Sequence, residues 1–221
     1  MKEIRFGIIG MGVQGSYYAD ILAGRREIPQ PQGCVLGAVC SRSDKSREAE
    51  KLGVPWFRDW RELLASGSCD AVILTVPHFQ HHEIAIAALE QGIHVLCEKP
   101  AGVRASDVRR MLDAQARSTA KLGMFLQQRT IPLFNRIREI VASGELGQLR
   151  RSNWIINTYW RPDSYYASAT WRGTGRGRAA ASWSTSFPTI WICGCICAVR
   201  RSGSLPGTAT VPTGGSPWRT M

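Results

Sequence analysis

The chain has 221 residues and a formal net charge of +11, from 28 lysines and arginines against 17 aspartates and glutamates. Such an excess would normally suggest nucleic acid or an anionic membrane as a partner. The distribution argues against both, because six arginines but no acidic residue follow Asp163, and residues 1–163 carry only +5. The basic residues also form no helical stripe or aromatic-interleaved motif, so we expect no nucleic-acid binding.

Targeting and metal signals are weak as well. Lys2, Glu3 and Arg5 interrupt the N-terminus, and no run of ~20 apolar residues follows, so neither a signal peptide nor a membrane span is expected. The cysteines and histidines do not follow metal-ligand spacing, and we expect no metal site. A cytoplasmic protein is the resulting prediction.

Short apolar runs alternate with helix-patterned segments along residues 1–126, which is typical of a parallel sheet with crossover helices. The predicted strands are residues 4–9, 34–40, 56–57, 71–76, 94–97 and 123–126. The predicted helices between them are residues 12–22, 44–51, 61–65, 82–91 and 106–121, the second capped by Ser43 and the last by Ser106. The fold class is therefore α/β, a doubly wound Rossmann domain.

A second domain is predicted to start after residue 126. A helix over residues 131–143 and an alternating strand over residues 148–160 would begin an α/β domain with an open sheet, over residues 127–174. A sheet needs several strands to be stable, and only one is recognisable in this part of the sequence. The domain is predicted to be incomplete.

The first chemical motif is a glycine-rich loop between the first strand and the first helix. It reads Gly10, Met11, Gly12, Val13, Gln14 and Gly15. In such a loop the first two glycines allow a tight turn and close approach to a pyrophosphate, and the third lets the helix pack against the strand. The helix N-terminus attracts the anion. We expect a dinucleotide here; the alternative is a glycine-rich turn with no ligand.

The end of the second strand bears on the choice of cofactor. An acid there would bind the ribose hydroxyls of NAD, but the chain has Ser41, Arg42 and Ser43. A guanidinium beside two hydroxyls suits a 2′-phosphate, so NADP is favoured over NAD. The alternative is a solvated arginine at a helix start.

A third signal lies at the ends of the fourth and fifth strands, where doubly wound folds bind ligands. Thr75, Val76 and Pro77 end one strand, with His81 close behind, and Glu98, Lys99 and Pro100 end the other. Lys99 can donate to a substrate oxygen and move the proton that accompanies hydride transfer.

Taken together, these motifs resemble the Gfo/Idh/MocA family of NAD(P)-dependent oxidoreductases, which includes glucose-fructose oxidoreductase and inositol 2-dehydrogenase. The resemblance covers residues 1 to about 174 and also includes Gln128-Arg129, Gly144-Glu145-Leu146-Gly147 and Trp171-Arg172-Gly173-Thr174. It implies a Rossmann domain followed by an α/β domain, a sugar, polyol or sugar derivative as substrate, and a homo-oligomer for full-length members. It further implies that Lys99 is catalytic and that the cofactor is lined by Thr75, Val76, Pro77, His81, Glu98, Lys99 and Gln128.

The sequence departs from the family pattern after Thr174. The family's His-Asn-x-Asp type segment, whose His and Asp join the lysine, has no counterpart here. Codons for Asn-Gln-Phe-Pro-His-Asn-Leu-Asp-Leu-Trp, read one base late, can give Thr-Ser-Phe-Pro-Thr-Ile-Trp-Ile-Cys-Gly, which is the sequence of residues 185–194. We therefore predict a frameshift between Thr174 and Ala179, with residues 175–221 an out-of-frame and poorly ordered tail.

Two functions remain open from the sequence. The first is an oxidoreductase acting on a sugar carbon, with Lys99 as acid/base. The second is a truncated, non-catalytic polypeptide that at most binds NAD(P). A divergent C-terminal domain is the alternative to the frameshift.

Overall fold

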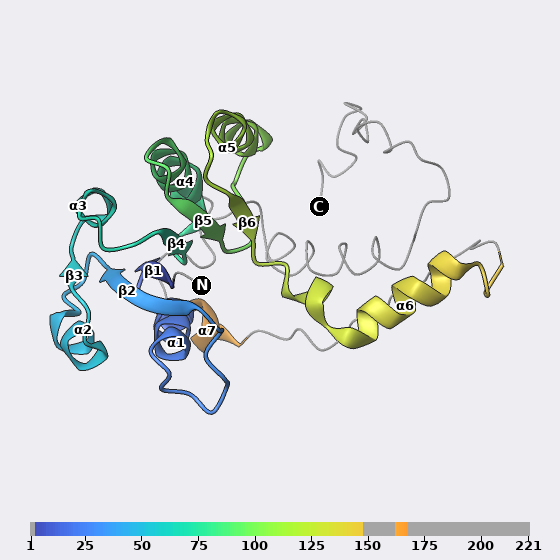
Figure 1. Ribbon diagram of the computed structural model, residues 1–221, viewed down its shortest axis with the longest axis horizontal. Coiled ribbons are helices and arrows are strands. Elements are labelled where there is room, and N and C mark those ends of the chain that lie inside the picture. The colour runs from blue at the N-terminus through green and yellow to red at the C-terminus, as the bar shows by residue number, and fades with distance from the viewer. Residues whose placement is uncertain (1–2, 148–161, 168–221) are drawn as a thin grey trace.

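The computed structural model describes residues 3–147 and 162–167, and its centre is a six-stranded parallel sheet (Figure 1). The strands are β1 (Ile4–Ile9), β2 (Cys34–Cys40), β3 (Trp56–Phe57), β4 (Ala71–Leu74), β5 (His94–Cys97) and β6 (Leu122–Met124). Their order is β3-β2-β1-β4-β5-β6, so the chain reverses direction across the sheet between β1 and β4. The predicted doubly wound parallel sheet is confirmed.

Helices cover both faces of this sheet. They are α1 (Val13–Leu22), α2 (Ser46–Leu52), α3 (Trp60–Ala65), α4 (His81–Glu90) and α5 (Ala105–Arg117), with a short 3-10 turn, η1 (His78–Gln80), before α4. In Figure 1, α1 and α2 lie below the sheet, and α3, α4 and α5 lie above it.

Two apolar cores result, one on each face, because successive strand residues point to opposite sides. Ile8 and Ile73 are buried with side chains of α1 and α2. Ile9, Val72 and Leu74 are buried with side chains of α3, α4 and α5. Burial on both faces explains the continuous apolar runs from which the central strands were predicted.

Several element boundaries differ from the predicted ones, and local hydrogen bonds explain them. The helix predicted from residue 44 begins at Ser46, because the Asp44 carboxylate accepts the Ser46 N–H at 2.9 Å and holds a turn instead. Ser43 does not cap this helix, nor does Ser106 cap α5. The helix predicted to reach residue 121 ends at Arg117, where the Ser118 hydroxyl donates to the carbonyl oxygen of Leu89 at 2.6 Å.

Beyond β6 the described chain contains η2 (Gln127–Thr130), α6 (Pro132–Ser143) and α7 (Asp163–Ala167). The helix predicted over residues 131–143 is α6, which extends away from the sheet in Figure 1 and buries none of its residues. The predicted strand over residues 148–160 and the tail over residues 175–221 lie outside the described residues. In residues 3–147 and 162–167, no helix has the length and apolar character that crossing a membrane requires.

Candidate cofactor-binding site

The carboxyl ends of four neighbouring strands bring the predicted site segments into one row. Backbone ladder bonds run from Gly10 N to Cys40 O (2.9 Å), from Thr75 N to Ile9 O (2.9 Å) and from Glu98 N to Leu74 O (3.0 Å). These bonds fix the first residue after β1, β4 and β5 beside the end of the adjacent strand. The order across this edge is the Ser41 segment, the glycine loop, the Thr75 segment and the Glu98 segment.

The three glycines of the loop have three different environments. Gly10 has a φ of +105°, and a Cβ there would lie 2.9 Å from the Thr75 carbonyl carbon and oxygen. A Cβ on Gly15 would overlap the carbonyl oxygen of Gly10 and lie 2.7 Å from Thr75 Oγ1. Gly12 instead faces open space, with no atom within 4 Å of a built Cβ. Two glycines are thus needed for packing, while Gly12 leaves room for a ligand.

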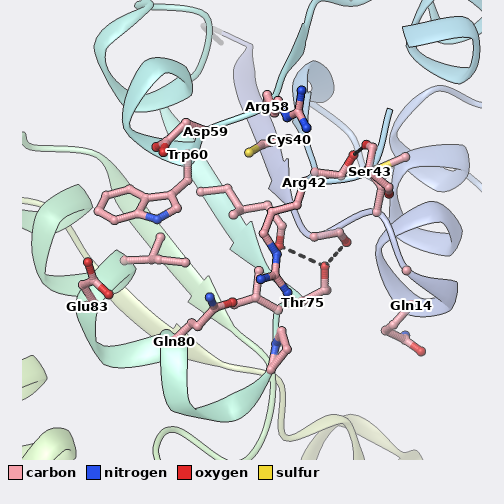
Figure 2. A pocket seen from close by; sticks show the side chains of 18 of the residues that line it. Gln14, Cys40, Arg42, Ser43, Arg58, Asp59, Trp60, Thr75, Gln80 and Glu83 are labelled. Carbon is pink, nitrogen blue, oxygen red and sulfur yellow. Dashed lines mark hydrogen bonds between the residues drawn. The ribbon is translucent and has the colours of Figure 1, made fainter. Parts of the chain in front are cut away.

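The start of α1 is open to an anion. Gly12 is its N-cap, no side chain caps it, and its first turn contains no acidic residue. The first N–H groups of the helix therefore keep their hydrogen-bonding capacity, and the helix dipole favours negative charge there. Thr75 fixes the loop from behind, because its hydroxyl lies 2.6 Å from Gly10 O and 3.2 Å from Ile9 O (Figure 2). This cradle fits a pyrophosphate.

A cavity of about 1080 Å³ opens from this loop toward β2 and β3. The predicted residues that line it are Gly10, Met11, Gly12, Val13, Gln14, Ser41, Arg42, Thr75, Val76 and Pro77. Five other predicted residues are not among its lining: Gly15, His81, Glu98, Lys99 and Gln128. Gly15 packs beneath the loop, and Gln128 lies half-buried in η2.

Some of the charged side chains on the cavity wall form salt bridges and others do not. Arg61 forms ion pairs with Glu83 (2.7 Å) and Asp59 (3.6 Å), so both acidic groups of the wall are engaged. Within the described part of the chain, neither Arg42 nor Arg58 forms a salt bridge, and both are exposed. In Figure 2, Arg58 lies near Cys40, whereas Arg42 extends from the Ser43 turn toward Thr75. Arg42 and Arg58 thus line the cavity without a salt bridge among the described residues, although hydrogen bonds from Ser46 and then the charge of Arg58 contribute to lowering the pKa of the nearby Asp44 carboxyl.

Ser41 shapes the turn after β2. Its hydroxyl donates to the carbonyl oxygen of Ser43 at 2.7 Å and accepts the Trp56 indole N–H at 3.2 Å. The hydroxyl proton is thus engaged by the protein, and only Arg42 and Ser43 have side chains exposed at this turn. Cys40, just before it, is buried, which raises the pKa of its thiol to about 12 and keeps it protonated.

On the other side of the Thr75 segment lies the turn that contains Glu98 and Lys99. The Glu98 carboxylate accepts the Tyr18 hydroxyl through Oε1 at 2.6 Å and the Lys99 backbone N–H through Oε2 at 3.1 Å. The peptide between Lys99 and Pro100 is cis. The side chains of Tyr18, Glu98 and Lys99 are all half-buried.

His81 lies behind the site rather than in the cavity. It is fully buried, and its Nδ1 and Nε2 each lie 2.9 Å from a backbone carbonyl oxygen, of Pro100 and Val76 respectively. Burial lowers the pKa of His81 against the opposing effect of these carbonyls. In the neighbouring turn, burial and the charges of His81 and Lys99 lower the pKa of His78 to about 4. Both rings are therefore neutral at physiological pH. No cluster of three or more His, Cys, Asp or Glu residues among the described ones could hold a metal ion.

Several residues of the site lack any sequence signal. Arg58 and Asp59, between β3 and α3, and Trp60, the first residue of α3, line the cavity from a part of the sequence that contains no motif. Tyr18 reaches Glu98 across 80 positions of sequence. A regular helical pattern places Tyr18 on α1, but only the folded sheet shows what it contacts.

The fold and the glycine loop define a dinucleotide-binding Rossmann protein. The sequence profile of an oxidoreductase family with an NAD-binding Rossmann fold, Gfo/Idh/MocA, matches residues 4–125. The chain belongs to this family, as the sequence motifs predicted.

Individual relatives agree with this assignment. The chain is 33% identical over 156 residues to an uncharacterized oxidoreductase of Rhizobium meliloti, covering 68% of this chain and 44% of that protein. It is 30% identical over 148 residues to a myo-inositol 2-dehydrogenase of Thermotoga maritima, covering 66% and 42%. The chain thus spans less than half the length of these relatives.

A solved structure is similar over more of the chain. The WlbA dehydrogenase of Bordetella pertussis, in complex with NADH and UDP-GlcNAcA, matches with a TM-score of 0.73 and 26% identity. The match covers 86% of this chain and 53% of that one.

Proposed function

We propose that this chain contains the cofactor-binding part of an NAD(P)-dependent oxidoreductase that transfers hydride to or from a sugar, polyol or sugar derivative. The observation that carries this proposal is the position of the glycine loop, Thr75 and the Glu98–Lys99 turn side by side at one edge of the sheet. The cavity beside Arg42 would hold the adenosine end of the dinucleotide, and the uncapped start of α1 its pyrophosphate. The inositol dehydrogenase and WlbA relatives support the substrate class.

In this reaction Lys99 would act as the acid/base. A bound NAD(P) would supply the hydride acceptor for oxidation of the alcohol, or the hydride donor for reduction of the carbonyl. In the oxidation direction, Lys99 would take the hydroxyl proton while the hydride goes to the cofactor, and the alcohol C–O bond would become a carbonyl. In reduction, the ammonium form of Lys99 gives the proton back. Lys99 lies next to a carboxylate that is held by Tyr18, at the sheet edge where ligands of doubly wound folds bind.

We propose NADP as the preferred form of the cofactor. The two acidic groups of the cavity wall are engaged by Arg61, whereas Arg42 and Arg58 are unpaired within the described residues. Such a pair of guanidinium groups suits a dianionic 2′-phosphate better than the two neutral hydroxyls of an NAD ribose.

Binding and turnover test this function separately. Fluorescence titration of the 221-residue protein with NADPH and NADH measures binding, and a panel of sugars and polyols with each oxidised cofactor measures turnover. We expect NADPH to bind more tightly, and Lys99→Ala to abolish turnover while leaving binding within about threefold. Lys121→Ala, which removes an exposed lysine elsewhere, is the matched control. Absence of binding to either cofactor would overturn the proposal.

The sequence after Thr174 favours a second function, that of a non-catalytic NAD(P)-binding chain. It contains no acidic residues, and residues 185–194 match the family's sequence translated one base out of frame. We propose that the reading frame shifts between Thr174 and Ala179, and that this chain then binds NAD(P) without turnover. Sequencing the coding DNA across codons 174 to 180 tests the shift. The frameshift would be overturned if the gene had one uninterrupted reading frame and the other frames encoded no sequence resembling the family. Turnover by the 221-residue chain would overturn the non-catalytic function.

A further inference from the structure

We propose that Tyr18 is a positioning residue that fixes the Lys99 turn through the carboxylate of Glu98. Tyr18 lies on α1, in the helix that follows the glycine loop, and Glu98 follows β5. The link therefore joins the helix that would bind the pyrophosphate to the turn that holds the proposed acid/base. The catalytic role of this link rests on the proposed function, but the effect of the Tyr18–Glu98 hydrogen bond on the Lys99 turn can be tested without substrate.

The two hydrogen bonds of Glu98 define the link. Each carboxylate oxygen has its own donor: the Tyr18 hydroxyl at 2.6 Å on Oε1 and the Lys99 backbone N–H at 3.1 Å on Oε2. The carboxylate is thereby held in one orientation, with its second oxygen directed at the backbone of its neighbour. Hydrogen bonds to an ionised acceptor are stronger than those between neutral groups.

The phenol can serve only as the donor in this pair. Burial and the adjacent Glu98 carboxylate raise the pKa of Tyr18 well above its usual value of 10. The hydroxyl therefore stays protonated wherever the enzyme would operate, and the bond to Glu98 persists across that range.

The ring of Tyr18 is itself fixed. It stacks on Phe125 with centroids 4.6 Å apart and an interplanar angle of 6°. Phe125 is anchored to the same sheet edge, because its N–H donates to Cys97 O at 2.9 Å. From α1, Tyr18 thus contacts the residues that follow β5 and β6, with its hydroxyl donating to one carboxylate oxygen of Glu98.

The labelling rate of the Lys99 amine tests this link in the full chain. Wild type, Tyr18→Phe, Glu98→Gln and the double variant are treated with N-hydroxysuccinimidyl acetate, and peptide mass spectrometry follows acetylation of each lysine. The Phe side chain keeps the stack on Phe125 and removes only the hydroxyl. Because a charge-assisted bond is lost, we expect Lys99 in Tyr18→Phe to be acetylated about tenfold faster, and the double variant no faster than Glu98→Gln alone.

Internal and matched controls separate this role from loss of structure. Lys51 and Lys121 are exposed and should keep their wild-type acetylation rates in every variant. Tyr17→Phe removes the adjacent hydroxyl, which has no hydrogen bond to Glu98, and should leave Lys99 unchanged. An unchanged Lys99 rate in Tyr18→Phe, a parallel rise at all lysines, or additive effects in the double variant would each overturn the proposal.

A spectroscopic measurement provides a second test that needs no Tyr18 variant. In protein labelled with ¹³C at tyrosine Cζ, Tyr18 should titrate above the usual tyrosine pKa of 10 in wild type, and its pKa should fall in Glu98→Gln because the neighbouring charge is gone. An identical Tyr18 titration in both proteins would contradict the link. Failure of cofactor binding in the titrations above would leave these two results standing, so the link and the proposed function can fail independently.

Discussion

The imidazole of His81 joins α4 to the Lys99–Pro100 turn, because its Nδ1 lies 2.9 Å from the carbonyl oxygen of Pro100. Its Nε2 lies at the same distance from the carbonyl oxygen of Val76, two residues after β4. One fully buried ring therefore contacts the backbone of the turns that follow β4 and β5. That His81 lines the cofactor stays a prediction; its ring nitrogens both contact backbone carbonyl oxygens, and it is not part of the cavity lining.

Replacing His81 should destabilise the protein. His81→Ala leaves the carbonyl of Pro100 or Val76 without its donor and creates a cavity in a fully buried position, which together should lower the free energy of unfolding by about 2–4 kcal/mol. Urea unfolding followed by circular dichroism measures this. Glu90→Ala, an exposed position on the same helix, should change stability by less than about 0.5 kcal/mol. Equal effects of the two substitutions would refute the role assigned to His81.

The buried histidines predict a pH dependence of stability. Burial lowers the pKa of His78 from 6.5 to about 4, so between these values the unfolded chain binds a proton that the folded chain does not. The free energy of unfolding should therefore decrease as the pH falls from about 6.5 to about 4. His81, whose pKa is shifted in the same direction, adds to this slope. Urea midpoints across this range should fall less steeply for His78→Gln than for wild type, and parallel slopes would contradict the shift.

Two glycines of the same loop should respond differently to alanine. Gly15→Ala brings a Cβ onto the Gly10 carbonyl oxygen and should cost about 3 kcal/mol of stability. Gly12→Ala meets no protein atom and has an ordinary φ of −78°, so its stability should change by less than about 1 kcal/mol. Because that methyl would occupy the pyrophosphate position, NADPH affinity should fall about tenfold or more. Titration and unfolding curves for both variants check this, and a Gly12→Ala protein with wild-type affinity would place the pyrophosphate elsewhere.

The centre of the sheet could be predicted because β4 and the C-terminal halves of β1 and β2 are buried on both faces and appear in the sequence as short apolar runs between turn residues. The helix boundaries could not, since they depend on competition between local acceptors, as when Asp44 accepts the Ser46 N–H and delays α2. The glycine loop was recognisable because Gly10 and Gly15 are required by local packing.

The site was predictable only where it follows a motif. Arg58 reaches the cavity because β3 pairs with β2, and nothing in its own segment indicates a ligand. The Ser41 hydroxyl, predicted beside a phosphate, donates to Ser43 O, a contact that depends on the conformation of the turn. The partnership of Tyr18 with Glu98 likewise requires the three-dimensional arrangement of α1 and β5.

The unpaired guanidinium groups of Arg42 and Arg58 lead to a prediction about cofactor choice. If both face the 2′-phosphate, Arg42→Ala and Arg58→Ala should each weaken NADPH binding about tenfold or more, because each removes a charge-assisted contact. NADH lacks that phosphate, so its affinity should change by less than about threefold. Arg47→Ala, on exposed α2 outside the cavity lining, removes the same charge and controls for long-range electrostatics. Equal losses of NADPH and NADH affinity in the Arg58 variant would show that Arg58 contacts a part common to NAD and NADP. If Arg47→Ala weakened NADPH binding as much as Arg42→Ala, net charge rather than a local contact would determine the cofactor preference.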